Sequence, residues 1–324
     1  MHAYIIRRVL LMIPTMLVVT LTIFVAVRLI PGDIIDIMSG QISGGYTSSK
    51  KTEEVQRAWL EQRLGLDKPM HIQYGLWLRD LLQGDLGMSL WRESSINKEI
   101  AGKIPVSVEL GIFGMITAML ISFPIGIYSA IRQDTVGDYI GRSIAIGFMA
   151  VPSFWLGIMV TVFPSLWWGW SPPIRFIPFL KDPLENLAQF ALPGVILGMG
   201  LCGYNMRYIR TMMLEVLRQD YIRTAWSKGL KERVVVVRHA LRNALIPVVT
   251  LLGIQLPVLV AGVVILEQIF NLPGIGRFLV SSAFTRDYTV ISAITVIVAV
   301  FVVFTNLGID LLYGYLDPRI RYGK

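Results

Sequence analysis

Long apolar stretches without any charged residue dominate the chain. Six of them are about 20 residues long or longer, the length of helix that crosses a hydrocarbon layer about 30 Å thick. They run Val9–Val27, Leu110–Ile131, Ser143–Ile174, Asn186–Met206, Asn243–Leu266 and Tyr288–Ile309. Because they contain no Asp, Glu, Lys, Arg or His, the pattern predicts an all-α membrane protein with six transmembrane helices.

The third stretch is longer than one span. We place its helix near 144–168, with a belt of tryptophans at the membrane surface and a pair of prolines ending it. These residues are Trp167, Trp168 and Trp170 for the belt and Pro172 and Pro173 for the end. The other helices of a core over residues 105–315 are expected near 106–131, 187–210, 243–266 and 288–312, followed by a tail at 316–324.

The first apolar stretch follows Arg7 and Arg8, as the core of a secretory signal would. It is longer than a usual signal core, and the residues from Arg28 to Asp33 lack a small-x-small cleavage site. We therefore expect residues 1–30 to be an uncleaved transmembrane anchor.

Basic residues outside the spans indicate the orientation. They stand before the first span, between the second and third, between the fourth and fifth, and after the sixth; the segment Arg207–Arg242 alone holds nine basic and three acidic residues. With six spans these places share one side, so both termini are expected in the cytoplasm. The net charge of +8, in a chain with only 16% charged residues, is then a topology signal, and we expect no nucleic-acid partner.

Residues 31–104 are then expected outside the cytoplasm as a small loop or cap between the first two helices. The segment Pro31–Lys103 is nearly neutral, with nine basic and ten acidic residues. Its beginning is rich in Gly and Ser, which is typical of a loop. One helix is predicted over Thr52–Leu64 and another after Pro69, where Tyr74 and Trp77 recur at helical spacing.

Sequence motifs of catalysis are missing. The chain has no His-Glu-x-x-His, no Gly-x-Ser-x-Gly and no phosphate-binding loop. One cysteine, Cys202, and three scattered histidines offer no metal cluster. We therefore expect neither an enzyme nor a bound cofactor.

Three glycines in the fourth span, Gly198, Gly200 and Gly203, spell a dinucleotide-binding pattern, but no strand precedes them. With Gly194 they predict close packing of helices instead.

The uncharged spans also bear on the energy source. Ion-coupled transporters usually keep ionisable groups inside the membrane, so their absence favours energy supplied from elsewhere. A secondary transporter or channel that works alone remains the alternative, because carbonyl and hydroxyl groups can also hold sodium.

The segment between the fourth and fifth spans predicts a short helix that projects from the membrane. Tyr221, Ile222, Ala225 and Trp226 form one apolar helical face, and Gly229 breaks the helix. A second, less regular apolar face follows at Val234, Val235, Val237 and Leu241. The residues alone leave two interpretations open: a helix lying on lipid headgroups, or a docking element for a soluble partner.

This segment resembles the signature loop of permeases of ATP-binding cassette (ABC) importers: Glu-Ala-Ala, three residues, Gly, nine residues, Ile-x-Leu-Pro. Here Arg223-Thr224-Ala225, Gly229 and His239–Arg242 occupy those positions, departing at the first, second and last. The departures resemble the dipeptide/oligopeptide branch, whose loop reads much like Asp220–Ala225 followed by Lys228–Leu230.

Other stretches resemble the same branch along nearly the whole chain. They are Arg28–Asp33, Leu64–Pro69, Gly84–Leu90, Arg238–Pro247, Phe270–Gly276, Arg286–Tyr288 and Asp310–Arg321, and the least similar stretch is Ile34–Lys51.

The resemblance implies a type I ABC importer permease fold and a place in the inner membrane of a prokaryote. It implies a subunit that moves dipeptides, oligopeptides or related small solutes into the cytoplasm. The implied partners are a second, homologous permease, two ATPase subunits that carry ATP and magnesium, and an extracytoplasmic solute-binding protein. Nickel chelates, glutathione and oligosaccharides stay open as solutes.

The resemblance also implies a coupling helix within a loop at 213–242. Its residues for docking an ATPase would be Asp220, Tyr221, Arg223, Thr224, Ala225 and Gly229. Gly229 would permit the turn, Ala225 a close contact, and Arg223 a charge at the rim.

Overall fold

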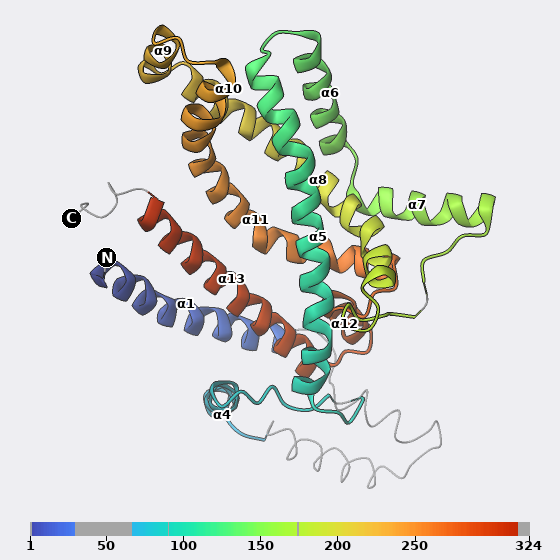
Figure 1. Ribbon diagram of the computed structural model, residues 1–324. Helices are drawn as coiled ribbons and strands as arrows, with labels where there is room; N and C mark the ends of the chain where they lie inside the picture. Colours follow the sequence, from blue (N-terminus) through green and yellow to red (C-terminus); the bar gives the residue numbers. More distant parts are fainter. Residues whose placement is uncertain (1, 30–66, 90, 174, 317–324) are drawn as a thin grey trace. The chain divides into compact units, whose positions relative to one another are not determined.

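The protein is described by a computed structural model that covers residues 2–29, 67–89, 91–173 and 175–316 (Figure 1). The helices are α1 (His2–Leu29), α4 (Met70–Leu82), α5 (Ile96–Ile131), α6 (Val136–Ala150), α7 (Ser153–Trp168), α8 (Pro183–Leu217), α9 (Asp220–Ser227), α10 (Glu232–Val234), the π-helix η1 (Val235–Leu241), α11 (Arg242–Ile269), α12 (Ile275–Phe284) and α13 (Tyr288–Leu316).

The predicted fold class is confirmed. Five of the described helices are long and apolar enough to cross a membrane, and the bent pair α6 and α7 makes a sixth if it counts as one span. Two predicted segments, the helix at Thr52–Leu64 and most of the tail at 316–324, lie outside the described residues. The expected boundary between cap and core, at residues 104 and 105, falls inside the continuous helix α5.

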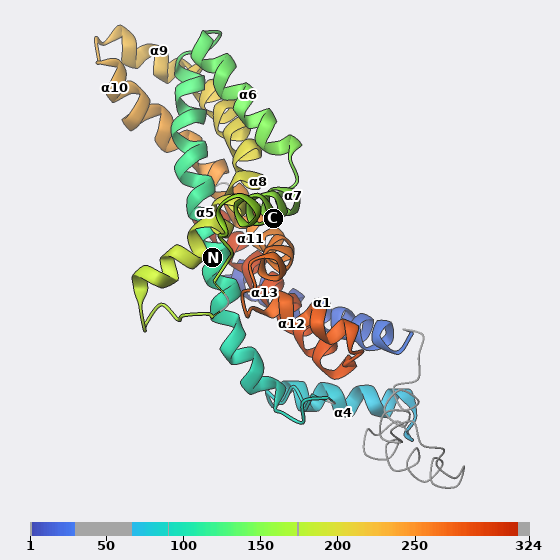
Figure 2. The same ribbon diagram turned by 90° about the vertical axis from the view of Figure 1, so that its right-hand side faces the viewer.

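The chain divides into two compact units. Unit 1 comprises residues 1–9, 102–278 and 301–324, and unit 2 comprises residues 10–101 and 279–300. Within unit 1, the turn between α5 and α6 lies at the same end as α9 in both views (Figures 1 and 2).

The third span differs from the single helix that we expected near 144–168. The structure breaks it between α6 and α7, which are bent by 84°. Val151 is extended, with φ −101° and ψ 118°, and Pro152 follows it. Proline has no N–H to donate and disfavours a helical conformation in the residue before it, so the helix stops and restarts in a new direction.

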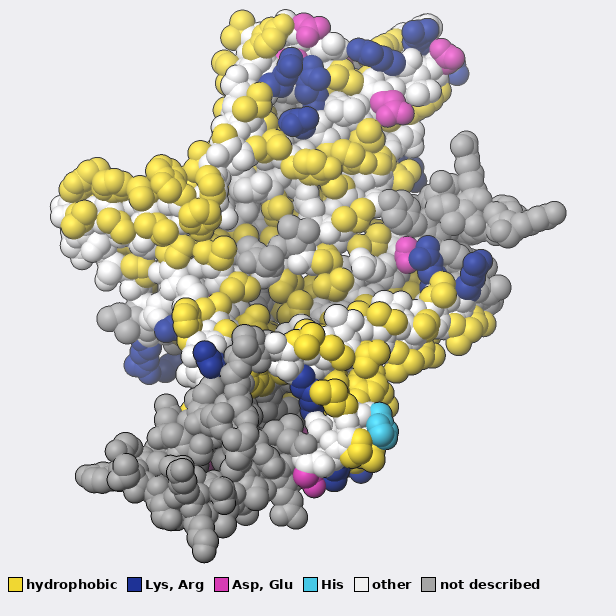
Figure 3. All heavy atoms as spheres, turned by 180° about the vertical axis from the view of Figure 1, so that it is seen from behind, with side chains coloured by type: hydrophobic (Ala, Val, Ile, Leu, Met, Phe, Trp, Pro, Cys, Tyr) yellow, Lys and Arg dark blue, Asp and Glu magenta, His cyan; other side chains and the backbone are white. Residues whose placement is uncertain are grey.

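The end of α7 is also set differently from our expectation. Gly169, with φ +66°, ends the helix, rather than the prolines that follow. Its N–H donates to the Ser165 carbonyl at 3.1 Å, and the Trp170 N–H donates to the Pro164 carbonyl at 3.2 Å. This is the usual left-handed cap of a helix C-terminus. Hydrophobic side chains cover the arm formed by α7 on the face seen in Figure 3.

The predicted close packing at the glycines of the fourth span is confirmed inside unit 1. A Cβ atom on Gly198 of α8 would lie 2.6 Å from the Thr117 Cβ of α5. A Cβ atom on Gly203 would overlap the Ala145 carbonyl oxygen of α6. The three helices therefore approach backbone to backbone, as small residues allow in membranes.

Glu267, which the sequence places at the end of the fifth span, lies inside α11 and is fully buried. Its carboxylate accepts hydrogen bonds from the Ser107 hydroxyl at 2.5 Å and the Arg277 N–H at 2.8 Å. The Ser107 hydroxyl in turn accepts from the Ile275 N–H at 2.8 Å. Glu267 and Ser107 thus satisfy first-turn N–H groups of α12, which have no partner within the helix.

Within unit 2, α4 packs against α1. The rings of Tyr74 and Trp77 lie 5.3 and 5.7 Å from the ring of Phe24, and the Tyr74 and Thr20 hydroxyls are 3.0 Å apart. The aromatic spacing seen in the sequence therefore forms a contact with the first span.

A second contact in unit 2 joins two stretches 198 residues apart in the sequence. The Ser89 hydroxyl donates to Asp287 Oδ2 at 2.5 Å, and both side chains are buried. The other oxygen of Asp287 accepts from the Val290 N–H in the first turn of α13. One carboxylate thus caps α13 and holds Ser89.

The packing of α5 against α8 predicts a sharp difference between two alanine substitutions. Gly198→Ala should destabilise the protein by about 1–3 kcal/mol, because an added methyl group overpacks the contact with Thr117. Gly200→Ala is the matched control, since its Cβ would meet the Ser153 Cβ at an ordinary 4.0 Å. Thermal unfolding in detergent measures both, and equal melting temperatures would contradict the close contact.

Candidate functional site

Helix α9 is a single short helix that begins directly after α8. Asp220 stands in its first turn, where a negative charge is favourable. The helix ends at Ser227, and Gly229 follows with φ +74°. The Gly229 N–H donates to the Trp226 carbonyl at 2.9 Å. The glycine break predicted from the sequence is confirmed.

The apolar face predicted for α9 is divided by the structure. Ile222 and Ala225 are buried, whereas Tyr221 and Trp226 are 43% and 45% exposed. The two buried side chains belong to a core cluster that also contains residues of α5, α8, η1 and α11. Its other buried members are Ala130, Ile209, Met213, Val235, Val236, Ala240, Ala244 and Val248. This cluster fastens α9 to unit 1.

Five of the six predicted docking residues are exposed at the surface, and Ala225 is not. Asp220 and Arg223 form an ion pair at 3.5 Å with side chains 96% and 72% exposed. Thr224 is also exposed, and its hydroxyl donates to the Asp220 carbonyl at 3.0 Å. The close contact of Ala225 is made inside the chain, with the core cluster.

Two further features hold α9 in place. The Asn243 amide of α11 donates to the Tyr221 hydroxyl at 2.8 Å, so one flank of α9 is tied to the start of the next span. After the turn at Gly229, the chain returns through α10 and the π-helix η1, whose residues Val235, Val236 and Ala240 are buried. The irregular apolar pattern of this segment has a physical cause, because a π-helix does not follow the α-helical period.

A buried ion pair lies on the same end of unit 1, and sequence reasoning missed it. Asp138 of α6 is fully buried and accepts two hydrogen bonds from Arg210 of α8, at 2.8 and 2.7 Å. The Asp134 N–H donates to the same carboxylate at 3.1 Å. The pair fixes the α5–α6 turn to the part of α8 that leads into α9.

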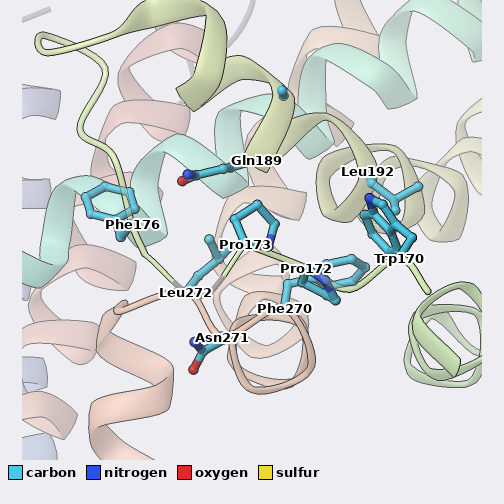
Figure 4. A pocket seen from close by; sticks show the side chains of 10 residues that line it. Trp170, Pro172, Pro173, Phe176, Gln189, Leu192, Phe270, Asn271 and Leu272 are labelled. Atoms are coloured by element: carbon cyan, nitrogen blue, oxygen red, sulfur yellow. The ribbon is translucent and has the colours of Figure 1, made fainter. Parts of the chain in front are cut away.

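A pocket also opens in unit 1, away from α9 (Figure 4). It is mostly apolar, and the Gln189 amide in its wall is already bonded to the Arg175 carbonyl and the Ile177 N–H. Its lining residues are Trp170, Pro172, Pro173, Phe176, Ala188, Gln189, Leu192, Phe270, Asn271 and Leu272. The described part of the chain holds no group of three or more His, Cys, Asp or Glu side chains that could bind a metal ion.

A comparison with family models decides the identity of the chain. Residues 122–322 match the model described as "Binding-protein-dependent transport system inner membrane component", and residues 1–111 match its N-terminal companion model. The chain belongs to this family. It is therefore a multi-pass inner-membrane permease component and not itself an ATPase, and it works with an ATPase and a binding protein.

Curated relatives match this permease over almost its full length. The oligopeptide transport system permease protein AppB of Bacillus subtilis is 39% identical, covering 99% of this chain and 100% of the relative. The dipeptide transport system permease protein DppB of Escherichia coli is 35% identical, covering 100% of both. A crystal structure of an amino acid ABC transporter with histidines matches with a TM-score of 0.50 at 13% identity, covering 68% of this chain and 94% of that one. This last likeness supports the fold alone.

The Asp138–Arg210 pair of the permease predicts a double-mutant result. Arg210→Met should destabilise the protein by about 3 kcal/mol, because it leaves a buried carboxylate without its cation. Replacing both partners, as Asp138→Leu with Arg210→Met, should recover most of the loss. Arg223→Met, which breaks an exposed ion pair, should leave the melting temperature unchanged. Thermal unfolding of the four proteins is the measurement, and a double variant no more stable than Arg210→Met alone would refute the pairing.

Proposed function

We propose that the chain is a pore-forming permease of an importer that moves dipeptides or oligopeptides into the cytoplasm, powered by ATP hydrolysis on partner subunits. The full-length similarity to permeases named for dipeptide and oligopeptide transport supports peptides as the solute class. The uncharged spans support an external energy source. In the helices that contain these spans, the buried carboxylates of Asp138 and Glu267 are held by partners within the fold, Arg210 for the first and Ser107 for the second.

The observation that carries the proposal is α9 itself. It is a short helix that presents Asp220, Arg223 and Thr224 outward and is held from behind by buried Ile222 and Ala225. Such an element suits a cleft on a soluble subunit. We propose that α9, within the loop 213–242, docks on an ATPase from the cytoplasmic side, with Tyr221 at its flank and Gly229 permitting the turn.

Docking of α9 on a cytoplasmic ATPase also sets the orientation of the chain in the membrane. Lys and Arg side chains gather at the end of unit 1 that carries α9 (Figure 3), and the rule that basic loops stay inside supports a cytoplasmic location for this end. Both termini then lie in the cytoplasm, residues 1–30 form an anchor, and residues 31–104 form an outer loop where a solute-binding protein would deliver its load. Residues 105–315 would form the permease core.

A second, related permease and two ATPases would complete the importer. Closure of the ATPases on ATP would move α9, and its contacts would carry the movement into the spans. The core cluster joins α9 to α5, α8 and α11, and Asn243 bonds to Tyr221. A part of the protein linked in this way would move together, as alternating access requires.

A permease that works alone is the rival function, and reconstitution separates the two. Proteoliposomes should contain this chain and its second permease, with or without the ATPases and ATP. Peptide uptake is expected only when the ATPases, ATP and the binding protein are all present. Uptake by the two permeases without the ATPases and ATP would refute the proposal.

The left-handed turn at Gly229 predicts a contrast between two substitutions. Gly229→Val should reduce peptide uptake strongly, because a β-branched residue is strained at φ +74° by about 1–2 kcal/mol and would displace α9. Gly229→Asn should keep most of the uptake, because Asn adopts this conformation readily. A Cβ at this position meets no atom within 4 Å, so neither change should lower the amount of protein in the membrane. Uptake and ATPase co-purification are measured together, and wild-type values for Gly229→Val would remove the role of the turn.

A further inference from the structure

Helix α9 leaves two aromatic side chains exposed, Tyr221, whose hydroxyl is bonded to Asn243, and the larger Trp226. On a helix with 100° between successive residues, Ile222 and Ala225 point into the unit, and Asp220, Arg223, Thr224 and Ser227 point away from it. Trp226 lies at the edge between these two faces and is 45% exposed. An indole in this position offers a large apolar area next to a polar ridge.

Lipid headgroups are too far from α9 to cover this indole. Gly203 packs against Ala145, and Arg210 bonds to Asp138, so α6 and α8 run side by side in fixed register. Arg142 and Arg207 then lie at the same level on the two helices, and both are exposed. Exposed arginines at one level of two neighbouring helices are typical of the place where the hydrocarbon layer ends, and we take this level as its inner boundary.

The length of α8 beyond that boundary gives the distance from the hydrocarbon layer to α9. From Arg207 to the end of α8 at Leu217, the helix rises about 15 Å at 1.5 Å per residue. A headgroup layer is only about 5–8 Å deep, and a tilt of about 20° shortens the rise by less than a tenth. Helix α9 therefore lies beyond the headgroups, where a protein surface is the available partner.

The charges around Trp226 describe that surface. The segment Arg218–Arg242 has seven basic and two acidic residues, and Asp220, one of the two acids, is already paired with Arg223. A complementary surface carries carboxylates around its edge. Trp and Arg are also the residues that most often dominate the binding energy of protein interfaces.

We propose that Trp226 anchors α9 in an apolar pocket of the ATPase subunit, and that carboxylates at the rim of this pocket face Arg223 and Lys228. This rests on the docking role proposed above and adds the chemistry of the partner. The ATPase that fits this permease has a cleft with an apolar floor and an acidic rim, and Trp226 makes the permease specific for such an ATPase.

The test is the affinity of the ATPase subunits for the complex of both permeases in nanodiscs of zwitterionic lipid. Trp226→Ala should weaken binding about 10- to 100-fold, and Trp226→Phe should recover most of it. Trp167→Ala is the matched control, because Trp167 is a 66% exposed tryptophan of α7, and it should leave the affinity unchanged. Arg223→Glu should weaken binding at low salt, with a smaller difference at high salt.

Two outcomes would overturn the anchor. One is an unchanged affinity in Trp226→Ala, and the other is a loss seen only in nanodiscs with anionic lipid, which would assign the indole to headgroups. Cross-linking separates these from a failure of docking itself. The single native cysteine, Cys202, is buried, so Thr224→Cys places one reactive thiol on α9. Cross-linking to the ATPase with unchanged Trp226→Ala affinity overturns the anchor alone, and no cross-link overturns the docking role as well.

Discussion

Hydrocarbon offers no hydrogen bonds, so every peptide group and every charge in a membrane span must find its partner inside the protein. The permease meets this constraint with helices, which satisfy their own backbone, and with a few buried polar groups whose partners come from other helices. Glu267 receives its hydrogen bonds from Ser107 and the start of α12. At the end of unit 1 that carries α9, a buried charge is satisfied in the same way, because Asp138 receives its hydrogen bonds from Arg210 and the Asp134 N–H. The packing at Gly198 and Gly203 has a second cause in the same solvent. Lipid gives helices no strong hydrophobic drive to associate, so they associate by close approach of their backbones.

The spans could be predicted from the sequence because an uncharged, apolar run of about 20 residues is typical of a transmembrane helix. The break in the third span could not. Pro124, Pro193, Pro247 and Pro257 all lie inside continuous helices, whereas Pro152 ends one helix and starts another. Neighbouring helices and side chains can compensate for the lost hydrogen bond, and that compensation depends on tertiary contacts that the local sequence does not contain.

The candidate site shows the same division between local and long-range information. The helical period around Ile222 and the break at Gly229 are local, and both were predicted. Which side of α9 faces the rest of the chain is decided by the core cluster, and this placed Ala225 inside while Trp226 stayed exposed. The ion pair between Asp138 and Arg210 joins residues 72 positions apart, and no spacing rule connects them.

The π-helix at Val235–Leu241 lies in the return path from α9 to the fifth span. Its bonds link residues five apart instead of four, so it holds one residue more than an α-helix would need. If the segment kept all its residues and wound as an ordinary α-helix, the surplus residue would turn everything before it by about 100° relative to α11. The angular setting of α9 against α11 thus depends on the wide turns of this segment, and a change in its winding, with no change of sequence, would re-aim α9.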